Sequence, residues 1–322
     1  MRLEAEYILP VRWTADDALS ELTAYLRRLT QWIDVTVVDG SEPALFATHA
    51  RAWLGLVRHR PVTVPHGSNG KVRGVLTGIE LSRHEAIVIA DDDVRYERGA
   101  LASIVADLKS ADLVKPQNYF TPAPWHARWD TARSLLNRAL GSDYPGTYAL
   151  RRSTIMAAGG YDADVLFENL ELERTVRAMG GTVRIRRDLF IARRPPSVQH
   201  FLSQRVRQAY DSFTQPGRLL LEASILPVLV GLRRRPGAIM LLVVLAMAVA
   251  EYGRQRNHGS TVFPRSSVLW VPLWIVERGV ATWLAVGLRV RGGVRYSGGR
   301  IRNAASPTRV LRDRLSVQRG QR

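Results

Sequence analysis

The chain has 322 residues, of which 46% are hydrophobic, so it can bury a substantial core and is not a wholly disordered protein. It contains no cysteine, which excludes disulfides and thiolate metal sites. The formal net charge is +17, and the excess lies in the last third of the chain: residues 1–200 carry 26 Lys and Arg against 24 Asp and Glu, and residues 201–322 carry 20 against 5.

The positive excess coincides with the most apolar part of the sequence. Arginines that flank apolar segments are typical of a protein at an anionic membrane surface. A nucleic-acid-binding protein more often carries a basic face on its folded domain. The distribution therefore predicts an anionic membrane surface as a partner, and no nucleic acid.

Residues 1–195 alternate between short apolar runs and amphipathic stretches. The opening "MRLEAEYILPVRW" has two acids and no long apolar core, so we expect no signal peptide. Strand-like runs are separated by helical patterns such as "ELTAYLRRL" and "LFENLELERTVRAM"; the runs are "AEYILPV", "IDVTVVDG", "RPVTV", "AIVIA", "ADLVKPQN", "TYALRR" and "TVRIRRDLFIARR". This alternation predicts an α/β domain, with a mostly parallel sheet flanked by helices and a ligand site beyond the carboxyl ends of its strands.

Pro195 and Pro196 mark the end of this domain. Residues 196–216 then show apolar residues at helical spacing, with Arg205 and Arg207 on the polar side, which predicts an amphipathic helix at a membrane interface. Residues 291–322 form a basic, arginine-rich tail.

Residues 217–290 contain three apolar blocks, at 219–232, 236–252 and 268–288. The first is too short to cross a bilayer, which needs about 20 residues, so we expect it to lie in the interface and the other two to span. Two spans place the arginines at 233–235 and the tail on the cytoplasmic side of the cell membrane, together with the α/β domain. The alternative is a buried helical subdomain.

Three consecutive aspartates, Asp91, Asp92 and Asp93, follow the strand-like run "AIVIA". On an extended chain the first and third side chains point the same way and the second points the other way. Paired carboxylates at a strand end suit a hard divalent cation such as Mg²⁺ or Mn²⁺. The alternative is a solvated turn or a helix N-cap before "ERGAL".

Two further segments offer groups that suit a nucleotide ligand. Asp39 ends the run "VTVVDG" and can accept hydrogen bonds from a base or a ribose, although an Asp-Gly turn explains it equally well. The stretch "GSNGKVRG" combines backbone amides at a helix start with Lys71 and Arg73, a plausible cradle for a diphosphate. Its spacing is not that of a Walker loop.

In order and spacing, these motifs resemble those of the family 2 glycosyltransferases, which have a GT-A fold. The resemblance covers roughly residues 3–214 and rests on five stretches: "YILPVRW", "VTVVDGS", "NGKVRGVLTGIELS", "VIADDDVRYERGAL" and "GTYALRRSTIMAAGGYDADVLFENLELERTVRAMGG". A further motif, "QRVRQ", is similar to the Gln-x-x-Arg-Trp motif of membrane-associated members, which include ceramide glucosyltransferases and processive synthases.

The resemblance assigns roles to individual residues. It implies that Asp91 and Asp93 bind the metal and that Glu168 or Glu171 is the catalytic base. It further implies contacts to the nucleotide-sugar donor from Pro10, Asp39, Lys71, Arg73, Asp92, Gln204 and Arg207.

Two positions depart from the family pattern. The acidic pair that supplies the base is Glu168-Asn169 here, and an asparagine cannot remove a proton. The Trp of the last motif is Gln208, which removes an aromatic surface for stacking a sugar and argues against processive synthesis.

The resemblance thus implies an inverting, metal-dependent hexosyltransferase that moves a sugar from a nucleoside diphosphate to a hydroxyl or phosphate of a lipid-linked acceptor. Two alternatives stay open at this point. One is a sugar-phosphate nucleotidyltransferase, which should carry a Gly-rich signature after the first strand where this chain has "LPVRWTADD". The other is a catalytically degenerate membrane scaffold of the same fold, which Asn169 makes credible.

Overall fold

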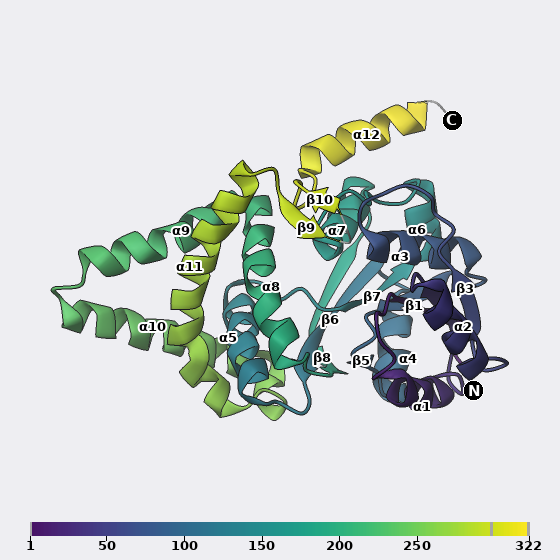
Figure 1. Ribbon diagram of the computed structural model, residues 1–322, viewed down its shortest axis with the longest axis horizontal. Coiled ribbons are helices and arrows are strands. Elements are labelled where there is room, and N and C mark those ends of the chain that lie inside the picture. Colours follow the sequence, from purple (N-terminus) through teal and green to yellow (C-terminus); the bar gives the residue numbers. More distant parts are fainter. Residues whose placement is uncertain (1, 297–298, 321–322) are drawn as a thin grey trace.

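The computed structural model describes residues 2–296 and 299–320, and its centre is an eight-stranded sheet (Figure 1). The order of the strands across the sheet is β3-β2-β1-β4-β7-β6-β8-β5. In chain order the strands are β1 (Ala5–Val11), β2 (Asp34–Asp39), β3 (Arg58–Pro61), β4 (Ala86–Ala90), β5 (Val94–Arg95), β6 (Leu113–Phe120), β7 (Thr147–Arg151) and β8 (Val183–Arg193).

The predicted α/β class with a mostly parallel sheet is confirmed. Strands β3, β2, β1 and β4 pair in parallel, and β6 pairs in parallel with β8. The exceptions are β7, which runs antiparallel between β4 and β6, and the short edge strand β5. The carboxyl ends of β1, β2 and β4 therefore meet at one rim of the sheet.

Helices cover both faces of the sheet because successive strand residues point to opposite sides. On β1, Tyr7 packs in a core cluster with residues of α1 and α4, whereas Ile8 packs in a second cluster with residues of α3 and α7. The helices of this domain are α1 (Leu19–Leu29), α2 (Pro43–Ala52), α3 (Gly70–Leu81), α4 (Arg98–Asp107), α5 (Trp125–Leu140), α6 (Arg152–Ala157) and α7 (Glu168–Ala178).

The rest of the chain is mainly helical. It comprises α8 (Val198–Tyr210), the 3-10 helix η1 (Asp211–Thr214), α9 (Pro216–Gly231), α10 (Pro236–Gln255), the 3-10 helices η2 (Arg256–Thr261) and η3 (Arg265–Trp270), α11 (Val271–Val290), the hairpin β9 (Val294–Tyr296) and β10 (Gly299–Ile301), and α12 (Thr308–Gly320). Figure 1 shows α9 and α10 extending together away from the sheet, beyond α11, and joined at the far tip.

Helix α8 is fixed between the domain and α11 by a buried arginine. The Arg205 side chain, which the helical pattern placed on the polar side, is only 7% exposed. It lies 2.8 Å from Asp130 on α5 and 2.9 Å from Glu277 on α11. Glu277, an acid in the middle of an apolar block, is therefore the partner of a cation on α8.

Two stretches within the described residues, Pro236–Thr261 and Arg265–Val290, are long and apolar enough to cross a membrane by length and composition. The most apolar part of the first is only 11% buried, so its side chains are exposed to the surroundings. Near the end of α10, however, Gly253 packs on the α/β domain: a Cβ at this position would lie 2.0 Å from the carbonyl oxygen of Leu135 on α5. One end of α10 thus lies against α5, and the other lies at the tip.

After α11 the chain returns to the α/β domain, which the sequence did not indicate. The Asn303 carbonyl accepts a hydrogen bond from the Leu166 amide at 3.0 Å, and the Ala304 carbonyl accepts one from the Phe167 amide at 2.7 Å. We call residues 301–306 the C-terminal strap. It lies directly beside the chain that leads into α7.

Candidate active site

A cavity of about 820 Å³ lies at the rim where the carboxyl ends of the parallel strands meet. Ligands bind at this edge of open α/β sheets. Nine of the eleven residues expected to act on a metal, donor or acceptor line it: Pro10, Lys71, Arg73, Asp91, Asp92, Asp93, Glu168, Gln204 and Arg207. Asn169, beside Glu168 at the start of α7, lines it as well.

Lys71 joins two of these carboxylates. Its Nζ lies 2.5 Å from Asp91 Oδ1 and 2.7 Å from Glu168 Oε1. Burial disfavours the ammonium, but the carboxylates of Asp91 and Glu168 outweigh burial and raise the pKa of Lys71 above its ordinary value. Asn69 positions this lysine, because its side-chain oxygen caps α3 by accepting the amides of Lys71 and Val72.

Arg193, from the end of β8, holds the other carboxylate of the predicted metal pair. Its Nε donates to Asp93 Oδ2 at 2.7 Å, and its Nη2 lies 3.4 Å from Asp91 Oδ2. Burial raises the pKa of Asp93 to about 6, because the neighbouring charges of Asp91 and Asp92 add to burial and outweigh the lowering by Arg193. The other oxygen, Asp93 Oδ1, is buried and has no hydrogen-bond partner among the described residues.

The Asp91 carboxylate fits into its position because residue 146 is a glycine without a side chain. A Cβ on Gly146 would lie 2.6 Å from Asp91 Oδ2, so any side chain at this position would displace the carboxylate. The backbone repeats the contact, since the Asp91 amide donates to the Gly146 carbonyl at 2.8 Å. Asp92 is held separately, by the indole Nε1 of Trp13 at 2.5 Å.

Of the two candidate bases, only one is accessible from the cavity. Glu168 lines the cavity, whereas Glu171 is buried away from it and accepts a hydrogen bond from the Ser306 amide of the C-terminal strap at 2.6 Å. Burial raises the pKa of Glu171. Asn169 donates from its amide to the Pro145 carbonyl at 3.1 Å.

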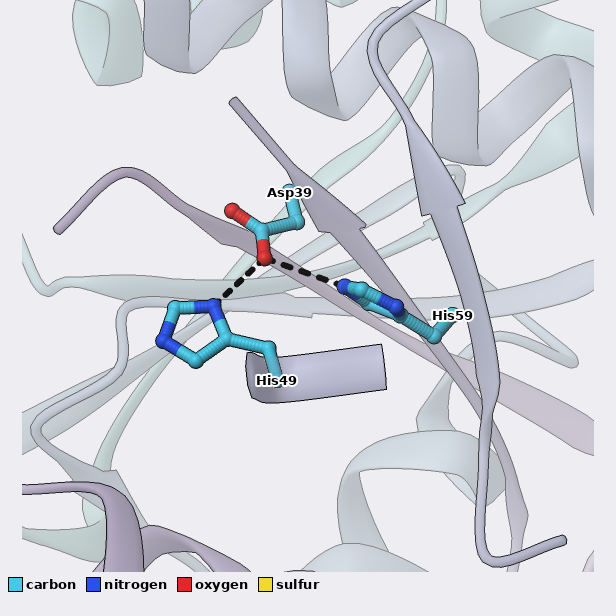
Figure 2. Close-up of side chains that lie close together, drawn as sticks. All are labelled: Asp39, His49 and His59. Atoms are coloured by element: carbon cyan, nitrogen blue, oxygen red, sulfur yellow. Dashed lines mark hydrogen bonds and ion pairs between the residues drawn. The ribbon is translucent and has the colours of Figure 1, made fainter. Parts of the chain in front are cut away.

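Asp39 is placed differently from the other predicted residues. Its side chain is buried and does not line the cavity, although Gly40 beside it does. One oxygen accepts the Ser41 amide at 2.9 Å, and the other lies 2.6 Å from His49 Nδ1 and 3.0 Å from His59 Nε2 (Figure 2). Burial raises the pKa of Asp39, but the hydrogen bonds from His59, His49 and Ser41 outweigh burial and lower it overall. Contact with a base or ribose would require these bonds to open.

Sequence reasoning missed several residues of the cavity wall, among them Arg133 on α5, Arg218 on α9 and Asp211. Asp211 follows Gln204 by seven positions and Arg207 by four, which is the spacing of one helical face, so the helix signal could have found it. Burial raises the pKa of Asp211 to about 7, although Arg207 lowers it. The cavity therefore holds an acid that changes charge near neutral pH.

No family model and no curated protein matches this sequence. A mannosyltransferase from Pyrobaculum calidifontis, solved in complex with GDP-Man and Mn²⁺, is similar in structure with a TM-score of 0.51 at 15% identity, over 88% of each chain. Glucosyl-3-phosphoglycerate synthase from Mycobacterium tuberculosis, in complex with Mn²⁺, UDP and glucosyl-3-phosphoglycerate, scores 0.41 at 18% identity, over 61% of this chain and 74% of that one. Mannosyl-3-phosphoglycerate synthase from Rubrobacter xylanophilus scores 0.41 at 13% identity, over 62% and 69%.

The first similarity extends over most of both chains and shows the fold. The chain has the GT-A type of α/β fold, as the resemblance implied. At 15% identity the likeness speaks to the fold alone.

Replacing Asp211 by asparagine should reduce the amount by which the free energy of unfolding falls as pH rises. The folded protein holds the Asp211 proton up to about pH 7, whereas an ordinary aspartate releases it near pH 4, so this group lowers the free energy of unfolding as pH rises from 4 to 7. The loss is at most about 4 kcal/mol, at about 1.4 kcal/mol per pKa unit. Denaturation of the detergent-solubilised chain at pH 5 and pH 8 should show a smaller loss for Asp211→Asn than for the unchanged protein. Asp164→Asn is the control, because the pKa of Asp164 is lowered by its bonds to Ser68. Equal losses for Asp211→Asn and the unchanged protein would contradict the assignment.

Proposed function

We propose that the protein is a metal-dependent, inverting glycosyltransferase that moves a hexose from a nucleoside diphosphate sugar to a hydroxyl or phosphate of a lipid-linked acceptor. The observation that carries the proposal is one cavity in which Asp91, one of the paired carboxylates at a strand end, shares the Lys71 ammonium with the accessible Glu168. The Mn²⁺ and GDP-Man named for the similar mannosyltransferase agree with this choice of donor and metal.

The residues at the end of β4 fit a hard divalent cation. Carboxylate oxygens are the ligands that Mg²⁺ and Mn²⁺ prefer, and Asp93 offers a buried oxygen with no partner among the described residues. We therefore assign the metal to Asp91 and Asp93. When bound there, Mg²⁺ or Mn²⁺ would neutralise the charge that develops on the departing diphosphate.

The side chains around the metal pair supply the rest of the chemistry. Lys71, Arg193 and Arg207 line the cavity and add positive potential where the diphosphate would lie. Glu168 takes the proton of the acceptor hydroxyl as its oxygen attacks the anomeric carbon, and the bond from that carbon to the diphosphate oxygen breaks. A single displacement of this kind inverts the anomeric centre.

The access of the two glutamates favours Glu168 over Glu171 as the base. Asn169 keeps the degenerate scaffold as the second candidate, because the position beside Glu168 carries an amide already engaged with the Pro145 carbonyl. The two candidates differ in turnover, not in donor binding.

Exposed apolar side chains on α9, α10, η3 and α11 support an acceptor presented by the cell membrane; they include Leu220, Leu221, Met240, Leu241, Leu269 and Val290. The packing of Gly253 on α5 limits the possible topology. If α10 crossed the bilayer, the exposed arginines at its start, Arg233, Arg234 and Arg235, would lie on the face opposite the catalytic domain. In place of the span expected from the sequence for α10, we propose that these arginines and the catalytic domain share the cytoplasmic face, with α9 and α10 embedded in one leaflet.

Loss of Glu168 should abolish turnover. In membranes that contain the protein, a panel of labelled nucleotide sugars should include one donor that yields nucleoside diphosphate together with label in the lipid extract. Glu168→Gln should lower that rate by about 10²- to 10⁴-fold, since the base is lost while the shape is kept. Glu171→Gln, a matched control that can still accept the Ser306 amide, should retain activity. Release of pyrophosphate would favour a nucleotidyltransferase, and recovery of activity only in Asn169→Asp would favour the degenerate scaffold.

Donor binding should depend on the metal pair. Calorimetry with Mn²⁺ and the active donor should give heat with the unchanged chain and little with Asp91→Asn or Asp93→Asn, because an amide loses the charge that holds the cation. The exposed Asp188 on β8 provides the control variant Asp188→Asn. Unchanged binding in both metal-pair variants would remove the basis of the proposal.

The membrane topology can be tested with single cysteines, because the chain has none. Arg234→Cys at the tip and Lys109→Cys on the α/β domain should react with a membrane-impermeant maleimide from the same side of oriented vesicles. Both side chains are exposed, so a difference in labelling cannot result from burial of one site in the protein. Labelling from opposite sides would show that α10 crosses the bilayer.

A further inference from the structure

Outside the cavity, three side chains of types that bind metals converge on one point. Asp39 comes from the end of β2, His49 from α2 and His59 from β3. Their donor atoms all lie within 4.8 Å of one another. Figure 2 shows His49 Nδ1 and His59 Nε2 both directed at the same oxygen of Asp39.

A neutral His49 ring cannot donate a hydrogen bond to both of the carboxylates that face it. Its Nδ1 lies 2.6 Å from Asp39 Oδ2 and its Nε2 lies 2.9 Å from Asp16 Oδ1, so a carboxylate faces each nitrogen. A neutral imidazole has one N–H and can donate to only one of them. If Nε2 donates to Asp16, a lone pair on Nδ1 faces the Asp39 oxygen, and a metal ion bound between the two makes that contact favourable.

We propose that Asp39, His49 and His59 bind a transition-metal ion, Zn²⁺, at a site separate from the predicted Asp91 and Asp93 pair. Two imidazoles and one carboxylate are a common zinc ligand set, with water in the fourth position. Asp16 then acts as the outer carboxylate that orients a metal-bound histidine. Nitrogen donors distinguish this site from the oxygen-only pair, which suits Mg²⁺ or Mn²⁺.

The distances are close to those of a zinc site. Ligand atoms about 2.0–2.1 Å from a tetrahedral ion lie about 3.4 Å from one another. The Asp39 oxygen lies 2.6 Å and 3.0 Å from the two ring nitrogens, so these two pairs must separate by less than about 1 Å, and the ring nitrogens already lie within 4.8 Å of each other. Small side-chain rotations provide that much.

The surroundings favour a fixed, buried site. The ring of His49 is fully buried and stacks on Trp53 at 4.9 Å, and His59 stacks on Phe46 at 4.3 Å. These contacts hold both imidazoles in place. Trp13 packs edge-on against His49 and also donates to Asp92, so the proposed ion lies one side chain away from the aspartate trio.

Zinc binding can be measured on the full-length chain in detergent. After incubation with ZnCl₂ and gel filtration, the unchanged protein and an Asp91→Asn/Asp93→Asn variant should both retain one equivalent of zinc by elemental analysis. His59→Phe, which keeps the stack on Phe46, and His49→Gln should retain almost none. Asp16→Asn should bind zinc about 10- to 100-fold more weakly. His84→Gln is the matched control, because His84 pairs with the single carboxylate of Asp34 at 2.7 Å.

Cobalt provides a test that does not depend on whether variants fold. Titration of the unchanged chain with Co²⁺ should produce the visible absorption of a four-coordinate site, saturating at one equivalent and removed by Zn²⁺. Absence of bound zinc and of this absorption would overturn the proposal. So would a ¹⁵N spectrum that shows His49 protonated on both nitrogens in the presence of excess zinc, or full zinc retention by both His59→Phe and His49→Gln.

Discussion

The ammonium of Lys71 between Asp91 and Glu168 is the contact on which the geometry of the candidate site depends. Adjacent carboxylates repel one another by about 1 kcal/mol per pair even in water, and by more where water is partly excluded. Lys71 offsets that repulsion on one side and Arg193 offsets it on the other. Lys71 lies in the first turn of α3, Asp91 follows β4 and Glu168 begins α7, so one side chain links three separate elements.

Local patterns were enough to predict the parts of this arrangement that depend on strand ends. Asp91 and Asp93 follow a strand, Lys71 starts a helix, and strand ends of a parallel sheet share a rim, so their meeting follows from the order of elements. Gln204 and Arg207 were expected at the site because "QRVRQ" resembles the Gln-x-x-Arg-Trp motif, and both line the cavity. The mostly parallel sheet was predictable because alternating strands and helices leave few other topologies.

The rest could not be read from the sequence because it depends on contacts between distant segments. Asp39 ends its strand as expected, yet two histidines from α2 and β3 take up one of its oxygens. Glu171 has the spacing of a second base, but the C-terminal strap covers it. Periodicity identifies the apolar face of a helix without saying what lies against it. The packing of α10 on α5 could therefore not be predicted from the sequence, and neither could the pairing of Arg205 with Glu277.

The C-terminal strap also has a consequence for the order of events during synthesis. Chains emerge from the ribosome N-terminus first, and their domains begin to fold in that order. The hydrogen bonds that fix Leu166 and Phe167, just ahead of Glu168, come from Asn303 and Ala304, which are translated after all three apolar blocks. A nascent chain thus has its sheet, its aspartates and its lysine well before the entrance to α7 can be locked. Completion of the site waits until the apolar helices α9, α10 and α11 have left the ribosome.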